Sequence, residues 1–258
     1  MPISWEYGFQ YTLNRFSGRS LFDQPIDLIL LGALLVAFVF LIGIIRALYK
    51  DYKKTETVET LLFLLGMITL IPANIFGIVT NLCYSTLGMP EIAEIITIIN
   101  LFPMQFTYLC VNLFAIRMTF PKRYKLILVI LLILSVIMIG TVTWAITKGP
   151  PYFNVINFAQ VYSLNIQIIR FICLIPVAVI PISVFYYYAT KVREENRATS
   201  NRSIWLGTGI LSFAIAVIIP TVAVELRVFQ ALYVPAAIIF YVCFSMPDWF
   251  KRRIGWTK

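Results

Sequence analysis

The sequence contains no histidine and few charged residues of either sign. Among its 258 residues, Asp and Glu total 12, and charged residues make up 13%, whereas a soluble domain carries about 25%. The absence of histidine removes the side chain that most often binds metal ions and most often acts as a general base near neutral pH. We therefore expect no metal site and no cofactor, and we do not expect an enzyme.

Cysteine chemistry and phosphate-binding motifs are lacking as well. The four cysteines, Cys83, Cys110, Cys173 and Cys243, have no CxxC spacing, and three of them lie within apolar runs. This pattern is typical of small buried hydrophobic residues and not of a disulfide framework. No glycine-rich loop of the Walker type is present.

Long apolar runs are abundant, and they indicate an integral membrane protein. Hydrophobic residues make up 60% of the chain, and the mean hydropathy is +0.86. Since a spanning helix needs about 20 mainly apolar residues, the runs predict an all-α, polytopic fold, a bundle of seven transmembrane helices. The predicted transmembrane domain, 26–247, contains spans at about 26–48, 58–82, 91–117, 124–147, 162–190, 203–224 and 228–247.

Three shorter stretches suggest how the bundle is connected and bounded. Residues 1–25 are rich in Trp, Tyr and Phe, and we expect an extracytoplasmic segment, either at the lipid headgroups or as a loosely ordered tail. The short connection "ELR" predicts a tight hairpin of the sixth and seventh helices. The basic and aromatic tail 248–258 is typical of a cytoplasmic interfacial anchor.

The basic residues are distributed very unequally between the two sides of the predicted bundle. The net charge is +9, but this excess follows the positive-inside rule, and we expect no nucleic-acid partner. Four of the 21 basic residues fall on the opposite side, Arg15, Arg19, Lys148 and Arg227, and sixteen fall near the short connections of one side: Arg46, Lys50, Lys53, Lys54, Arg117, Lys122, Arg123, Lys125, Lys191, Arg193, Arg197, Arg202, Lys251, Arg252, Arg253 and Lys258.

This bias predicts a multi-pass protein of the cell membrane with its N-terminus outside and its C-terminus in the cytoplasm. The basic clusters are expected to lie against anionic lipid at the cytoplasmic face. They could also form a docking surface for a cytoplasmic protein. The sequence does not indicate an oligomeric state.

One arginine, Arg170, interrupts the apolar run "YSLNIQIIRFICLIPVAVIPISVFYYY". It lies about eight residues into the fifth span, roughly 12 Å from the outer end at 1.5 Å per residue. An unpaired arginine at the centre of a spanning helix costs about 2.5–3.5 kcal/mol, and somewhat less away from the centre. It can reach outward along its own helix, or it can pair inside the bundle.

The third predicted span carries a polar stripe that offers partners. At 100° per residue, Glu94, Thr97, Gln105, Tyr108 and Asn112 fall within an arc of about 80°. Lipid cannot satisfy such side chains, so we expect the third helix to be central with this stripe facing inward.

The depth of these groups predicts a cluster in the outer leaflet. Arg170 is expected near Glu94 and near Glu225 at the outer end of the sixth span, and Gln167 lies on the same helix face as Arg170. Two interpretations are open: a ligand or ion site that opens outward, or a buried pair that sets helix register.

Prolines and small residues suggest how the helices bend and pack. Prolines interrupt five spans, at Pro72, Pro103, Pro176, Pro181, Pro220 and Pro235, and each favours a kink. The small residues of "GTGILS", 207–212, predict close packing between helices.

Seven spans with the N-terminus outside resemble the seven-helix sensor modules of prokaryotic histidine kinases and related signalling proteins. The resemblance covers the whole chain and concerns its layout. It implies a receptor-like sensor, and because no output domain follows in the sequence, it also implies a cytoplasmic signalling partner. Two alternatives are a small transporter or channel with a polar path along the third helix, and a non-catalytic subunit of a membrane complex.

Overall fold

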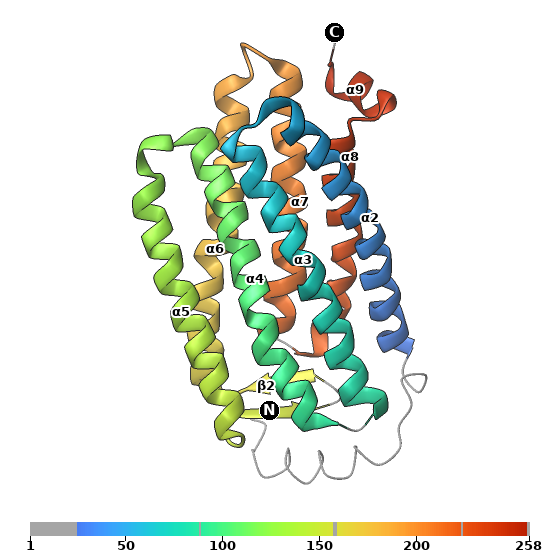
Figure 1. The fold of residues 1–258 in the computed structure, drawn as a ribbon, viewed down its shortest axis with the longest axis vertical. Coiled ribbons are helices and arrows are strands. Elements are labelled where there is room, and N and C mark those ends of the chain that lie inside the picture. The colour runs from blue at the N-terminus through green and yellow to red at the C-terminus, as the bar shows by residue number, and fades with distance from the viewer. Residues whose placement is uncertain (1–24, 88, 157–158, 223, 257–258) are drawn as a thin grey trace.

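The computed structural model describes residues 25–87, 89–156, 159–222 and 224–256, and residues 1–24, with the predicted N-terminal segment, lie outside this part. Within the described residues, seven helices are long and apolar enough to cross a membrane, as the sequence predicts. They form a single bundle (Figure 1). The helices are α2 (Pro25–Thr55), α3 (Val58–Leu82), α4 (Pro90–Thr119), α5 (Tyr124–Lys148), α6 (Leu164–Val192), α7 (Arg197–Val222) and α8 (Tyr233–Ser245). Helix α8 completes the seventh span together with the 3-10 residues that begin at Val228.

The ends of these helices follow ordinary capping chemistry. The Thr57 side chain accepts a hydrogen bond from the Thr60 backbone N–H at 3.4 Å and so caps the start of α3. Pro90 occupies the first turn of α4, where its missing N–H leaves no intrahelical bond unmade. Gly149, with φ of 65°, ends α5 in a backbone conformation that glycine adopts without strain.

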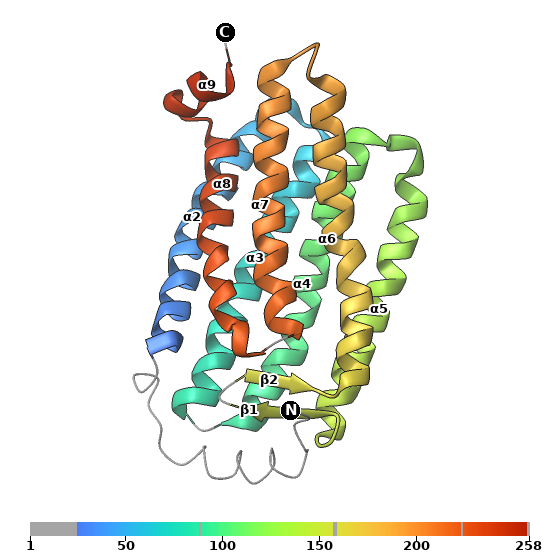
Figure 2. The same cartoon turned by 180° about the vertical axis from the view of Figure 1, so that it is seen from behind.

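The seventh span runs over Val228–Ser245, close to the predicted 228–247, but it is not one continuous α-helix. Residues Val224–Leu232 form a 3-10 segment, and the α-helix α8 begins only at Tyr233. Pro235 lies in the first turn of α8, two residues after the 3-10 segment gives way to α-helix at Tyr233. The expected hairpin is present, because α7 and α8 pack side by side (Figure 2).

A β-hairpin that no pattern in the sequence predicts lies between α5 and α6. Strands β1 (Phe153–Ile156) and β2 (Ala159–Tyr162) are antiparallel, with Phe153 opposite Tyr162. Both strands lie across one end of the bundle (Figure 2). Tyr162, predicted as the first residue of the fifth span, is instead the last residue of β2.

The two ends of the bundle differ in character. The hairpin end holds the π-helical turn Cys83–Leu87, the strands β1 and β2 and the 3-10 segment Val224–Leu232. The basic end holds the connections 56–57, 120–123 and 193–196 together with α9 (Asp248–Ile254). The first described helix starts at the hairpin end, and the last spanning helix finishes at the basic end (Figure 1). The described residues of the four predicted basic clusters therefore gather at one end of the bundle.

The predicted C-terminal anchor is the short helix α9. Its Phe250 and Ile254 side chains are buried, and α9 packs against α7. The Phe250 ring meets the Trp205 ring edge to face, with 5.8 Å between centroids. Trp249, on the same helix, is exposed.

Glycines in the predicted small-residue stretch allow close helix contacts, as expected. A Cβ added at Gly209 would lie 2.9 Å from the Phe240 ring of α8, and one added at Gly207 would lie 3.3 Å from the Tyr186 ring of α6. The prediction of close packing at 207–212 is thus confirmed at both glycines.

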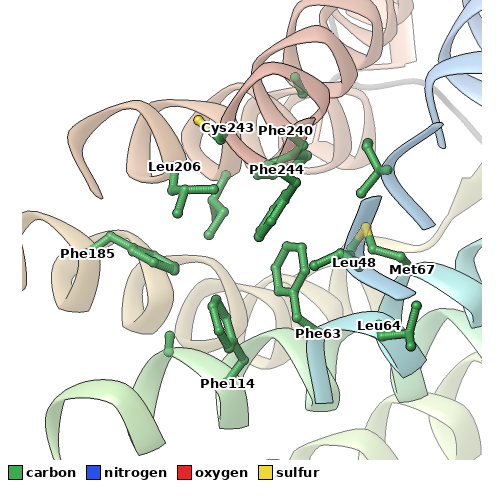
Figure 3. Packing of buried hydrophobic residues seen from close by; sticks show 14 of the residues in the cluster. Leu48, Phe63, Leu64, Met67, Phe114, Phe185, Leu206, Phe240, Cys243 and Phe244 are labelled. Atoms are coloured by element: carbon green, nitrogen blue, oxygen red, sulfur yellow. The ribbon is translucent and has the colours of Figure 1, made fainter. Parts of the chain in front are cut away.

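The buried apolar residues form two clusters, one toward each end. The cluster toward the basic end contains buried phenylalanines of five helices, α3, α4, α6, α8 and α9. Phe63 contacts Phe114 at 4.7 Å and Phe244 at 4.8 Å between ring centroids (Figure 3). The cluster toward the hairpin end includes Tyr84 and Tyr162. Side chains of both clusters line a cavity between them.

Candidate ligand-binding cavity

A cavity of about 250 Å³ lies at the centre of the bundle. Helices α2, α3, α4, α6, α7 and α8 and the 3-10 segment supply its lining, and no described residue of α5 does. Its volume is close to the lower limit of ligand pockets, which is about 300 Å³.

Helix α4 contributes one continuous face to this cavity. Its lining residues recur at helical spacing: Asn100, Met104, Thr107, Tyr108, Val111 and Asn112. Tyr108 and Asn112 belong to the predicted polar stripe, whereas Glu94, Thr97 and Gln105 do not line the cavity. At 100° per residue, the centre of the cavity face is offset from the centre of the stripe by about 50°, so the stripe only partly faces the cavity.

Asn112 joins α4 to α6 at the wall of the cavity. Its Nδ2 donates to the backbone oxygen of Tyr108 at 2.9 Å and to that of Val177 at 3.0 Å. The Val177 oxygen is free for this bond because Pro181, four residues later, has no backbone N–H. Because both acceptors are carbonyl oxygens, the amide must turn its Nδ2 toward them, and this fixes the orientation of the Asn112 side chain. The buried Oδ1 atom of Asn112 has no hydrogen-bond partner.

The lining of the cavity toward the hairpin end is rich in carboxamides. Asn74 and Asn81 of α3, Asn100 of α4 and Gln230 of the 3-10 segment line it. The buried Oδ1 atom of Asn100 has no hydrogen-bond partner. None of the lining residues in the described part of the chain is charged.

Toward the basic end the lining is apolar except for Asn112. Ile44, Phe63, Met67, Ile210 and Phe240 line this part. The cavity is therefore amphipathic along the bundle axis, with four of its five carboxamides toward the hairpin end and, apart from Asn112, mainly aliphatic and aromatic groups toward the basic end.

Arg170 is stabilised by an aromatic ring. Its guanidinium carbon lies 4.1 Å from the centroid of the Tyr162 ring, and such a cation–π contact is strongest where water is excluded. The buried Nε atom of Arg170 has no hydrogen-bond partner. Burial raises the pKa of the Tyr162 hydroxyl, so the ring remains neutral beneath the cation.

Tyr162 is held in place by a chain of hydrogen bonds that ends on α4. The Tyr162 hydroxyl donates to Gln160 Oε1 at 3.0 Å, and Gln160 Nε2 donates to Thr97 Oγ1 at 2.6 Å. Thr97 in turn donates to the Ala93 backbone oxygen at 2.8 Å. The outer part of the predicted stripe thus fastens the β-hairpin to the bundle.

The ion pairs between described residues are Arg117 with Glu59 and Lys251 with Asp248, each at 3.0 Å. The predicted pair of Arg170 with Glu94 is not among them. Glu94 is part-buried on α4. Grouping the two residues by leaflet predicts their depth, but it does not predict how the β-hairpin places an aromatic ring beside the arginine.

Of the remaining predicted site residues, Gln105 and Gln167 do not line the cavity. Gln105 is 6% exposed, and Gln167 is half-buried near the start of α6. Glu225 belongs to the 3-10 segment, and its side chain lies outside the described part.

Several residues of the site carry no obvious signal in the sequence. Tyr162 and Gln160 act through a β-hairpin of eight described residues, which lacks a long alternating pattern. Asn81 and Gln230 lie at helix ends, where polar residues are expected in any membrane protein. Their shared carboxamide chemistry is the one signal that links them to Asn74 and Asn100.

Comparison of the chain with protein-family models, with curated proteins and with solved structures finds no match. The cavity and the layout of the helices are therefore the features from which a function can be inferred.

Proposed function

We propose that this protein is a seven-helix, receptor-like sensor of the cell membrane that binds a small ligand inside the bundle and signals through a cytoplasmic partner. The observation that supports this is the central cavity of about 250 Å³, lined by six helices. Ligand pockets between bundle helices are a common arrangement.

The wall of the cavity offers a way to convert binding into a helix movement. Asn112 bonds across from α4 to the Val177 oxygen of α6, and Pro181 and Val177 themselves line the cavity. A ligand at this wall contacts both helices, so it can favour one of their arrangements over another. The α6–α7 connection at the basic end would present that change to a partner beside anionic lipid.

A transporter with a polar path along the third helix is the alternative function. The position of the stripe supports the sensor, because Glu94, Thr97 and Gln105 lie off the cavity. The phenylalanine cluster toward the basic end also supports a pocket that is closed on that side (Figure 3).

Single-cysteine labelling in proteoliposomes separates these two functions. Asn74→Cys probes the carboxamide part of the cavity, Met67→Cys probes the apolar part, and Lys122→Cys at the basic end is the control for access. All four native cysteines are buried, which keeps background labelling low. The sensor predicts that a membrane-impermeant maleimide from the basic side labels Lys122→Cys only. Labelling of both cavity positions from both sides would indicate a transport path.

The third possibility, a fixed subunit of a membrane complex, predicts a different behaviour of the partner. Ala237 lines the cavity and is 9% exposed, so Ala237→Leu fills part of the space. In a sensor this change alters the amount of partner recovered from native membranes in mild detergent. If the partner is recovered in the same stoichiometric amount with Ala237→Leu as with the native chain, the result would favour a subunit of a membrane complex over a sensor.

A further inference from the structure

The lining of the cavity limits the chemistry of its ligand. Four carboxamides, Asn74, Asn81, Asn100 and Gln230, gather toward the hairpin end, and no charged side chain of the described chain joins them. A carboxylate would enter without a cation to pair with, and an ammonium would enter without an anion. Since a buried charge is costly unless it is paired, this lining favours an uncharged ligand.

The carboxamides of α3 and α4 lie at one level of the bundle. Thr69 of α3 is hydrogen-bonded to Thr107 of α4, with 3.0 Å between their Oγ1 atoms, and the two helices run in opposite directions (Figure 1). Counting outward from this bond, Asn74 lies five residues along α3 and Asn100 seven residues back along α4. They therefore flank the same part of the cavity.

The hydrogen-bonding state of these amides selects for a particular group. Asn74 Nδ2 donates within its own helix to the Leu70 oxygen at 2.8 Å, and the buried Asn100 Oδ1 atom accepts no hydrogen bond. A free acceptor in a buried site is satisfied only by a donor. A hydroxyl or an amide N–H provides that donor, whereas an ether oxygen does not.

The size and shape of the cavity favour a slender molecule. Its lining on α4 extends from Asn100 to Asn112, which is about 18 Å at 1.5 Å per residue. A dry cavity of about 150 Å³ holds one benzene molecule, so by proportion a cavity of about 250 Å³ holds about ten non-hydrogen atoms.

We propose, building on the sensor function above, that the ligand is an uncharged, elongated amphiphile with a hydroxyl or amide head. The head lies between Asn74 and Asn100 and donates a hydrogen bond to Asn100 Oδ1. The apolar chain extends along the cavity toward Phe63 and Phe240.

Binding of 1-decanol tests this proposal. The full-length protein is placed in phosphatidylcholine nanodiscs, and radiolabelled 1-decanol retained above the level of empty discs is measured as a function of concentration. Decane, decyl methyl ether, decanoate and decylammonium are the competitors. We expect saturable binding of one 1-decanol per protein, with each competitor at least about tenfold weaker, since a buried hydrogen bond to an otherwise unpaired acceptor contributes at least a factor of this order.

Variants locate the bound head group. Asn100→Leu is expected to lower the affinity for 1-decanol about tenfold and to leave the affinity for decyl methyl ether unchanged. Asn74→Leu is the second variant should Asn100→Leu fail to fold. It is expected to lower the affinity for 1-decanol relative to the affinity for decyl methyl ether. Asn165→Leu, an exposed position on α6, is the matched control and leaves all affinities unchanged. Ala237→Leu is expected to remove the binding of every probe.

The possible failures are distinguishable. Equal, saturable binding of 1-decanol, the ether and decane, lost in Ala237→Leu, would overturn the hydroxyl or amide head but leave the sensor's ligand site standing. Tighter binding of decanoate or decylammonium would overturn the uncharged character in the same way. No saturable binding of any probe would overturn both this ligand class and the ligand site of the proposed function.

Discussion

Arg170 shows how a charge can be kept inside an apolar helix without a carboxylate. The face of an aromatic ring carries partial negative charge, and a desolvated cation above it gains about 2 kcal/mol. The Tyr162 ring supplies this at 4.1 Å and is itself buried. Because the ring comes from β2, the arginine also holds the hairpin against the bundle.

Substitutions at Tyr162 separate the ring from its hydroxyl. Tyr162→Phe keeps the ring and loses the bond to Gln160, so we expect it to lower the free energy of unfolding by about 1 kcal/mol. Tyr162→Leu also loses the cation–π contact, and we expect about 2 kcal/mol more. Thermal and denaturant unfolding in one detergent measures both.

The control is Arg170→Gln made in each of these two backgrounds. Its effect on stability should be clearly more unfavourable in the Tyr162→Phe background than in the Tyr162→Leu background. Equal effects would show that the ring does not stabilise the arginine.

A second residue-scale prediction concerns Asn112 and Pro181. Pro181→Ala restores an N–H that can donate to the Val177 oxygen within α6, so the bond from Asn112 Nδ2 becomes dispensable. Asn112→Leu should therefore cost about 1 kcal/mol less in the Pro181→Ala background than in the native chain. Additive effects in this double-mutant cycle would contradict the role assigned to the amide.

At the scale of elements, contacts between helices depend on where a backbone can approach its neighbour. Gly209→Ala places a Cβ 2.9 Å from the Phe240 ring, whereas Gly140→Ala on α5 meets nothing within 4 Å. Alanine is favoured over glycine in a helix by about 1 kcal/mol. We therefore expect Gly140→Ala to be neutral or stabilising and Gly209→Ala to lower the melting temperature. The same sign for both would show that α7 and α8 do not approach this closely.

Helix α9 provides a matched pair of aromatic residues for a test of docking. Phe250 is fully buried and Trp249 is 53% exposed. Phe250→Ala leaves a cavity that typically costs about 3–5 kcal/mol, which is enough to release a short helix. Trypsin should then cleave at Lys251 and Arg252 at least about tenfold faster, while Trp249→Ala should change the rate little. Equal cleavage rates would contradict the docking of α9 on α7.

Helix positions could be predicted closely from the sequence, because each span is a long apolar run with polar ends. Spans α3 and α5 begin where they are predicted, at Val58 and Tyr124. The β-hairpin could not be predicted, since its short strands have neither the length nor the alternation that marks a strand.

The candidate site could be predicted only in part. Tyr108 and Asn112 are identifiable because a polar stripe on a spanning helix must face protein. Residue counts along a helix give depth and angle within that helix, but they do not give its rotation relative to its neighbours. For this reason the sequence places Glu94 beside Arg170, and it does not reveal the carboxamides of α3 and the 3-10 segment as one group.

At the scale of the whole molecule, the two ends of the bundle are clearly different. The basic connections gather at one end, and the β-hairpin lies across the other (Figures 1 and 2). If the chain crosses the membrane at each of the seven helices, the carboxamide part of the cavity faces the outer leaflet and the basic end faces the cytoplasm.

Sidedness labelling of single cysteines tests this claim most directly. The positions at the basic end are Glu56, Lys122 and Glu195, and those at the hairpin end are Met89, Pro151 and Leu226. In intact cells, a membrane-impermeant maleimide should label the three hairpin-end cysteines, and it should label the basic-end cysteines only after the membrane is permeabilised. Labelling of a basic-end and a hairpin-end position from the same side would contradict seven crossings.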